Sequence, residues 1–186
     1  LDYMFLGSVA RKVVRDSPCP VYTIREQENP RAPQKIDCLL SPIDFSEHSG
    51  LAVSLARETA GLYDAKLQIL HVIEKASYPS FYKKENIEDT YPGANMAGLV
   101  HAEMNRFYRE SEGPDVEVEF HAVEGHVAHE ILEYAERNDI NMIVIATHGL
   151  SGLKHLLLGS VAEKVINRSP CPVLTVKGFG KNLIKS

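Results

Sequence analysis

Short apolar runs recur along the chain from residue 35 onwards, and their lengths are typical of β-strands. The runs at 36–40, 67–73 and 142–146 are predominantly apolar, as expected for strands that are buried on both faces of a sheet. Between residues 116 and 122, apolar and polar side chains alternate, so this strand is expected to be half-exposed and to lie at an edge. A fifth strand is predicted at 172–176.

Apolar residues at helical spacing separate these strands. They predict helices after Ser46, a good N-cap, and at 96–107, 128–138 and 160–168. Gly61 is expected near the end of the first of these helices. Strands that alternate with helices indicate βαβ units. We therefore expect an α/β fold with an open, five-stranded, mainly parallel sheet and helices on both faces, which is a Rossmann-like architecture.

An internal repeat divides the chain into unequal parts. Residues 5–24 align with residues 157–176 at an offset of 152, and 13 of the 20 positions are identical. The second copy closes the α/β pattern, whereas the first has no such pattern before it. We expect residues 1–25 to be the helix-strand remnant of a preceding copy of the domain. We expect a linker at 26–34, the complete domain at 35–178 and a tail at 179–186 to follow it.

Composition narrows the functional class. The 186 residues carry a formal net charge of −5, which argues against a general nucleic-acid-binding protein. No apolar run approaches the roughly 18 residues of a membrane span, and the three cysteines favour a reducing compartment over a disulfide framework. The expectation is a cytoplasmic protein that contacts neither nucleic acid nor membrane.

Candidate chemistry lies where strands end and helices begin, because ligands of open α/β sheets bind at the carboxyl ends of the strands. The first strand ends in Pro42-Ile43-Asp44, and the fourth ends in Ala146-Thr147-His148-Gly149. Gly159-Ser160 then opens a helix, where backbone N–H groups, a hydroxyl and the positive helix end suit a phosphate. Plain helix capping remains the alternative for this pair.

The residues from 146 to 176 resemble the universal stress protein family. ATP-binding members of that family carry the pattern G-x2-G-x9-G-[S/T], and Gly149 followed after nine residues by Gly159-Ser160 matches its latter part. Ala146 replaces the first glycine; binding is expected to survive if its φ is negative, whereas a positive φ would require the loop to shift. SPIDFSEHS at 41–49 and His71-Val72-Ile73 also resemble family motifs. The resemblance implies a fold of the adenine nucleotide alpha hydrolase type.

The resemblance also implies a nucleotide site. Asp44 would accept hydrogen bonds from the base or ribose, and the phosphates would be held by backbone N–H groups and the Ser160 hydroxyl. The residues carried over from the family are Pro42, Ile43, Asp44, Val72, Ile145, Ala146, His148, Gly149, Gly159, Ser160 and Val161. The implied ligand is ATP or AMP, with Mg²⁺ or Mn²⁺ accompanying the phosphates. No catalytic residue and no protein metal ligand is assigned.

The chain lacks the Gly-Lys-[Ser/Thr] signature of a Walker A loop, and no residue is obviously placed to orient an attacking water. The resemblance thus implies a stress-response binding or signalling module with at most slow ATP hydrolysis. Two alternatives stay open: a weak ATPase or nucleotidyl-transferring enzyme, and a nucleotide-free dimeric interaction module.

The fifth strand is expected to form an interface, because family members dimerise through it. Residues 21–24 should pair antiparallel with residues 173–176, within one chain as a pseudo-dimer or between two chains as a homodimer. The helix at 7–16 would then lack its own parent sheet. We expect it to be the least protected element or to pack on a neighbouring surface.

Overall fold

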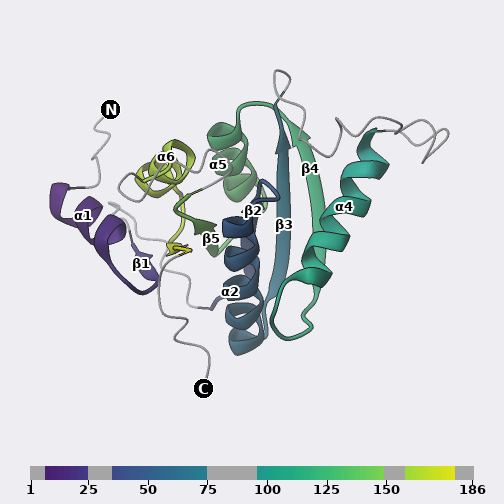
Figure 1. The fold of residues 1–186 in the computed structure, drawn as a ribbon, viewed down its shortest axis with the longest axis horizontal. Helices are drawn as coiled ribbons and strands as arrows, with labels where there is room; N and C mark the ends of the chain where they lie inside the picture. Colours follow the sequence, from purple (N-terminus) through teal and green to yellow (C-terminus); the bar gives the residue numbers. More distant parts are fainter. Residues whose placement is uncertain (1–6, 25–34, 75–95, 149–157, 179–186) are drawn as a thin grey trace.

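The computed structural model describes residues 7–24, 35–74, 96–148 and 158–178. In this part of the chain six strands form one sheet, in the order β1-β6-β5-β2-β3-β4 (Figure 1). The strands are β1 (Val21–Thr23), β2 (Cys38–Ile43), β3 (Lys66–Ile73), β4 (Val118–Glu124), β5 (Met142–Ala146) and β6 (Val173–Val176). All neighbours run parallel except β1 and β6. The predicted five-stranded parallel sheet is confirmed, and the N-terminal segment adds a sixth strand to it.

The sheet has β2 at its centre, and this strand ends where the sequence predicted but begins later. It begins at Cys38, two residues after the start of the apolar run at 36–40, and it continues through Ser41 and Pro42 to Ile43, in agreement with the predicted end at Pro42-Ile43-Asp44. A proline lacks the N–H that a central strand needs. Here β2 pairs with β5 only at Leu39 and Leu40, so Pro42 lies beyond that ladder while still facing Leu70 of β3.

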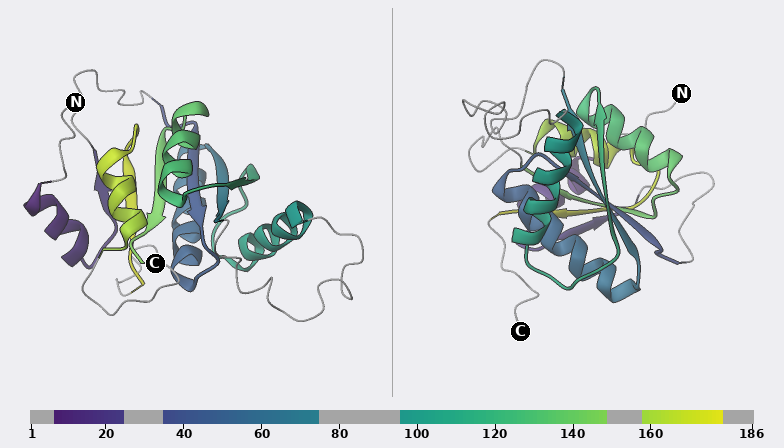
Figure 2. Two further views of the ribbon diagram at one scale, coloured as in Figure 1. Left: turned by 90° about the horizontal axis from the view of Figure 1, so that it is seen from above. Right: turned by 90° about the vertical axis from the view of Figure 1, so that its right-hand side faces the viewer.

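Helices cover both faces of the sheet (Figure 2). The helices are α1 (Ser8–Asp16), α2 (Glu47–Tyr63), α4 (Met96–Glu110), α5 (Val127–Arg137) and α6 (Ser160–Arg168). Buried residues of α2 and α4 form one core with the sheet, around Leu39, Leu67 and Val144. Residues of α1, α5 and α6 form the core on the opposite face. The result is the three-layer α/β architecture predicted from the hydrophobic pattern.

The start of α2 was predicted from its capping residue, whereas its exact end was not. Ser46 is the N-cap, and its hydroxyl accepts a hydrogen bond of 3.1 Å from the Ser49 N–H, as predicted. At the other end the helix passes Gly61 and ends at Tyr63, because Asp64 adopts the left-handed conformation with φ of 53°. Asp is one of the few non-glycine residues that tolerate this conformation.

The N-terminal segment packs against the end of the domain. The register of β1 with β6 pairs Val21 with Thr175 and Thr23 with Val173, so the antiparallel pairing expected for these segments is confirmed within one chain. Ile24 lies just outside the strand. The linker at 26–34 and the tail at 179–186 lie outside the described residues, as does the segment 75–95.

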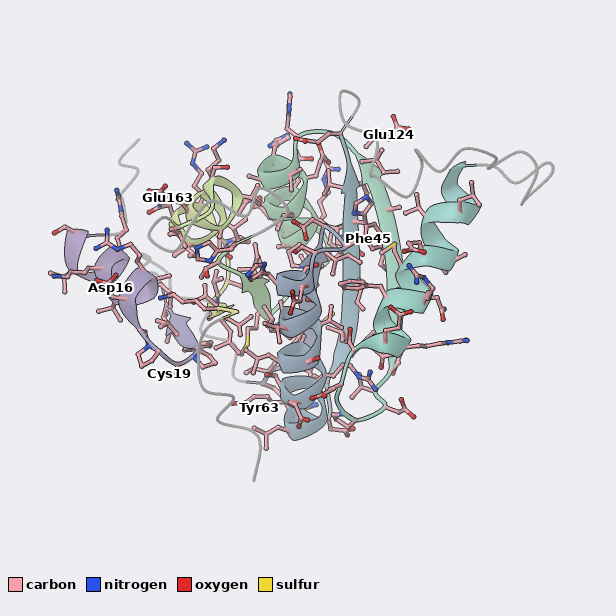
Figure 3. All side chains as sticks on the ribbon, in the orientation of Figure 1. Asp16, Cys19, Phe45, Tyr63, Glu124 and Glu163 are labelled. Atoms are coloured by element: carbon pink, nitrogen blue, oxygen red, sulfur yellow. The ribbon has the colours of Figure 1, made fainter. Side chains whose placement is uncertain are left out.

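Helix α1 contacts α6 but has an uncovered apolar side. Val14 is 2% exposed and joins the core beside α6, whereas Val9 and Val13 are 76% and 50% exposed. Arg11 lies 3.4 Å from the carboxylate of Glu163, a residue of α6 that is labelled in Figure 3. The helix therefore packs on a neighbouring surface, one of the two outcomes expected for it.

No helix among the described residues is long and apolar enough to cross a membrane.

Candidate functional site

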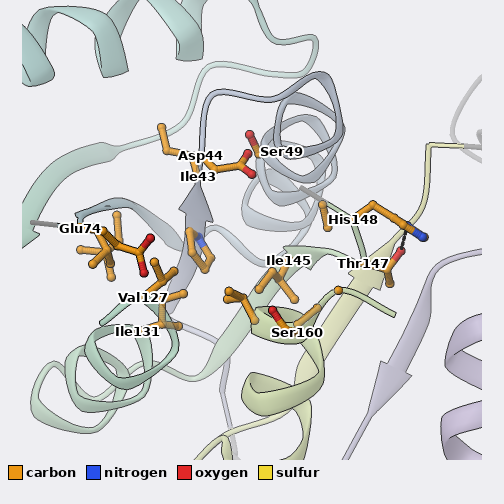
Figure 4. A pocket seen from close by; sticks show the side chains of 17 residues that line it. Ile43, Asp44, Ser49, Glu74, Val127, Ile131, Ile145, Thr147, His148 and Ser160 are labelled. Atoms are coloured by element: carbon orange, nitrogen blue, oxygen red, sulfur yellow. Dashed lines mark hydrogen bonds between the residues drawn. The ribbon is translucent and has the colours of Figure 1, made fainter. Parts of the chain in front are cut away.

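A pocket of about 290 Å³ opens at the carboxyl ends of β2, β3 and β5 (Figure 4). The first residues of α5 and α6 close it from the other side. The chain leaves β2 toward β3 on one side, while β5 lies on the other, so the pocket is at the point where the strand order reverses. That is where open α/β sheets bind their ligands.

The turn after β2 forms one wall of the pocket. Asp44 accepts a hydrogen bond of 3.0 Å from the Ser46 N–H through Oδ1, which ties the carboxylate to the start of α2. Phe45, between them, has a φ of 61°. A bulky side chain in the left-handed region is a strained arrangement that persists only where the surroundings fix it.

His71 on β3 supports this strained turn. Its Nδ1 lies 3.0 Å from the Ile43 carbonyl oxygen, and because a carbonyl only accepts, Nδ1 carries the proton. The Phe45 ring packs 4.6 Å from the imidazole, and His71 is only 4% exposed. Burial lowers the pKa of His71, so the neutral ring that donates to Ile43 is the favoured form.

The end of β5 forms the opposite wall. Ala146, which replaces the first glycine of the family pattern, is an extended strand residue and is not among the residues with positive φ. The condition stated for a tolerated alanine, a φ that is not positive, is therefore met. Beyond it, the Thr147 hydroxyl lies 3.0 Å from His148 Nδ1 and 3.3 Å from the Val176 carbonyl oxygen, which fixes this segment against β6.

The start of α6 lies directly on the Thr147 backbone. Gly159 is the N-cap, and its N–H donates to the Thr147 carbonyl oxygen at 2.8 Å. This N–H is therefore engaged and is not available to a phosphate in this conformation. A Cβ on Gly159 would lie 2.9 Å from the same oxygen. The glycine is needed for this close approach and not for its dihedral angles, because its φ is −59°.

The first turn of α6 remains directed toward the pocket. Ser160, Val161 and Ala162 all line it. The N–H groups of a first turn have no partner within the helix, and no side chain caps this one. Together with the positive end of the helix, they can hold an anion.

The structure brings almost all of the predicted residues together. Ten of the eleven line this one pocket: Pro42, Ile43, Asp44, Val72, Ile145, Ala146, His148, Gly159, Ser160 and Val161. Gly149 lies outside the described residues.

Sequence reasoning missed seven further lining residues: Ser49, Leu70, Glu74, Val127, Ile131, Thr147 and Ala162. Strand alternation could have found Leu70 and Glu74, because they share a face with Val72. Val127 and Ile131 come from α5, and only the packing of that helix over the sheet places them here.

The lining combines three kinds of chemistry. Leu70, Val127 and Ile131 give an apolar surface at one end, and α6 supplies N–H donors. Asp44 and Glu74 are the carboxylates among the described lining residues. The described residues contain no cluster of three or more side chains that could bind a metal ion. The arrangement suits a ligand with a flat apolar part, hydroxyl or amino donors, and an anionic group.

Comparisons with known proteins all point to one family. The model of the universal stress protein family matches residues 36–177. The universal stress protein YxiE of Bacillus subtilis is 33% identical over 146 residues, with 75% of this chain and 97% of that protein covered.

Two solved structures share the fold. A universal stress protein from Archaeoglobus fulgidus superposes with a TM-score of 0.61 at 27% identity, covering 95% of this chain and 55% of that one. A universal stress protein crystallised in complex with cAMP superposes with a TM-score of 0.54 at 24% identity, covering 77% of this chain and 98% of that one.

Proposed function

Because the chain belongs to the universal stress protein family, we propose that it binds an adenine nucleotide in the pocket at the carboxyl ends of β2, β3 and β5. The observation that carries the proposal is the convergence of ten residues, chosen from separated sequence motifs, on one pocket. A family member of the same fold was crystallised with cAMP, so adenine nucleotides are the first ligands to test.

The pocket suggests a role for each wall. Pro42, Ile43 and Ile145 would contact the faces of the adenine, and Val72 its edge. Asp44 would accept hydrogen bonds from the ribose hydroxyls or the base. Ser160 and Val161 would bind phosphate through their N–H groups and the serine hydroxyl, with Gly159 bringing the helix start close to β5. His148 lies beside the phosphate end of the pocket and can contact the same anion. We expect Gly149 to contact it as well.

We expect a binding or signalling module, with little or no hydrolysis of ATP. The described lining contains no lysine or arginine at the phosphate end, and Asp44 is committed to the turn before α2. Mg²⁺ or Mn²⁺ would enter as part of the ATP complex through the phosphates. The cysteine content favours action in the cytoplasm.

We further propose that residues 1–25 derive from a first copy of the domain, followed by a linker at 26–34, the domain at 35–178 and a tail at 179–186. The sequence repeat and the antiparallel pairing of β1 with β6 support this division. So does the Archaeoglobus relative, which matches 95% of this chain with 55% of its own length. The alternative is a homodimer in which β6 pairs with a second chain instead of with β1.

Two assays test the nucleotide proposal. Protein purified under native conditions is denatured, and the released small molecules are identified by mass spectrometry; we expect AMP, ADP or ATP. Phosphate release is then measured with excess ATP, and turnover is expected far below about 1 per second, the lower end of typical enzymes. Turnover near that value, proportional to protein and lost in Ser160→Ala, would instead establish an ATPase.

A further inference from the structure

Glu74 lines the pocket at the carboxyl end of β3. It follows β3 directly, and strand alternation puts it on the same face as Leu70 and Val72, which line the same pocket. The residue is exposed at the rim, and none of the sequence motifs pointed to it.

The two ends of the pocket differ in chemistry (Figure 4). Glu74 lies beside Val127 and Ile131, the apolar surface supplied by α5. His148 and Thr147 lie at the opposite end, and Ser160 marks the start of α6 below the centre. An anionic group bound at the N-terminus of α6 would leave the flat, apolar part of the ligand to extend toward Glu74.

We infer that Glu74 accepts a hydrogen bond from the exocyclic amino group of the base and thereby selects purines that carry a 6-amino group. The inference rests on the proposed nucleotide site and specifies which base it takes. An ionised carboxylate can only accept hydrogen bonds, so it favours the binding of a ligand with an amino donor at this end of the pocket. A purine with hydrogen at position 6 has no donor there and forms no hydrogen bond with Glu74.

A purely structural role makes a different prediction. An acidic side chain near the start of α5 can also favour the helix dipole, as Glu130 already does from within the first turn. In that case, removal of Glu74 would lower stability and leave the choice of base unchanged. Selectivity between two bases therefore separates the two roles.

The experiment compares AMP with purine riboside 5′-monophosphate, which differs only by hydrogen in place of the 6-amino group. Dissociation constants are measured by calorimetry for the wild-type chain and three variants. Glu74→Leu removes the acceptor, and Glu74→Gln keeps a weaker, neutral acceptor. Glu124→Leu is the matched control, because Glu124 is an exposed acid that pairs with Ile73 from the next strand and does not line the pocket.

The wild-type chain and Glu124→Leu should bind AMP about 3- to 10-fold more tightly than purine riboside 5′-monophosphate, the value of one net hydrogen bond at a solvated rim. The ratio should fall to about 1 in Glu74→Leu and take an intermediate value in Glu74→Gln. An unchanged ratio in Glu74→Leu would overturn the inference while AMP binding itself upholds the nucleotide site. Failure of the wild-type chain to bind either ligand would overturn both.

Discussion

Gly159 and Gly7 occupy equivalent positions in the two repeats but have different surroundings. Each is the N-cap of a nine-residue helix, with φ of −59° and −56°. A Cβ on Gly159 would lie 2.9 Å from the Thr147 carbonyl oxygen, whereas one on Gly7 would meet no atom of the described residues within 4 Å. The sequence repeat could not reveal this difference, because it depends on whether a strand end lies beneath the helix.

Gly159→Ala should lower the free energy of unfolding by about 1–3 kcal/mol more than Gly7→Ala does. Both substitutions share the cost of an alanine at an N-cap, so the difference isolates the contact with Thr147. Urea denaturation of both variants measures it. Equal losses of stability would mean that the approach of α6 to β5 is not tight.

His71 should make the stability of the protein depend on pH. Its pKa is lowered from the ordinary value of 6.5 by burial, and its Nε2 is buried without a hydrogen-bond partner among the described residues. As the pH falls below about 6.5, the unfolded chain binds a proton that the folded chain resists. The free energy of unfolding therefore falls on acidification until the pH reaches the lowered pKa.

Urea denaturation at pH 7.5 and 5.5 tests this dependence. His71→Phe retains a ring against Phe45 but cannot titrate, so its loss of stability between the two pH values should be smaller than that of the wild type. His129→Gln is the control, because the His129 side chain is 63% exposed. The idea fails if His71→Phe has the same pH dependence as the wild type.

Among the elements, the connection from α4 to β4 depends on one buried cation. Arg57 of α2 is 6% exposed and donates to the carbonyl oxygens of Tyr108, Ser111, Gly113 and Pro114 at 3.2, 2.6, 2.7 and 3.0 Å. Its guanidinium also lies 4.4 Å from the centre of the Tyr108 ring. Arg57 thus caps the end of α4 from another helix.

Arg57→Met should lower the free energy of unfolding by about 2–4 kcal/mol, because carbonyl groups lose their donor. Asp115→Ala removes the only carboxylate that pairs with Arg57 among the described residues, at 3.3 Å, and should cost less than about 1 kcal/mol because Asp115 is fully exposed. Chemical denaturation compares the two. Similar losses would mean that the ion pair, and not the carbonyl contacts, provides the stability.

Element types followed from local pattern, whereas some boundaries depended on tertiary context. The bounds of α6 and β5 were predicted as observed, because their periodicity and flanking residues agree. The apolar run at 36–40 placed the start of β2 two residues too early, and the position of Pro42 outside the β5 ladder is visible only in the sheet. The buried Arg57 gave no signal in the sequence, because its partners are carbonyl oxygens from about 50 residues away.

For the whole molecule, the N-terminal segment protects the edge of the sheet. Val173 and Thr175 of β6 are 1% and 2% exposed in the presence of β1. Removal of residues 1–25 would leave this strand as an unpaired apolar edge, which invites pairing with another chain.

Deletion of residues 1–25 should shift the protein to a dimer or to aggregates, as measured by light scattering coupled to size-exclusion chromatography. Deletion of residues 1–6 alone retains α1 and β1 and should leave the oligomeric state unchanged. A monomeric and equally soluble 1–25 deletion would contradict the protective role of β1.

Asp44, Ser160 and the apolar walls converge on one pocket, and this convergence is the basis for the proposed nucleotide binding. Asp44→Asn tests it most sharply, because the amide oxygen can still accept from the Ser46 N–H while the charge and the second acceptor are lost. Asp37→Asn is the matched control, because Asp37 directly precedes β2, as Asp44 directly follows it, and does not line the pocket.

Calorimetric titration with AMP and with Mg²⁺-ATP is the decisive measurement. The wild-type chain and Asp37→Asn should bind one nucleotide per chain with equal affinity, and Asp44→Asn should bind about 5- to 150-fold more weakly, which corresponds to about 1–3 kcal/mol. Saturable binding that Asp44→Asn leaves unchanged, or no binding by the wild-type chain, would contradict the account.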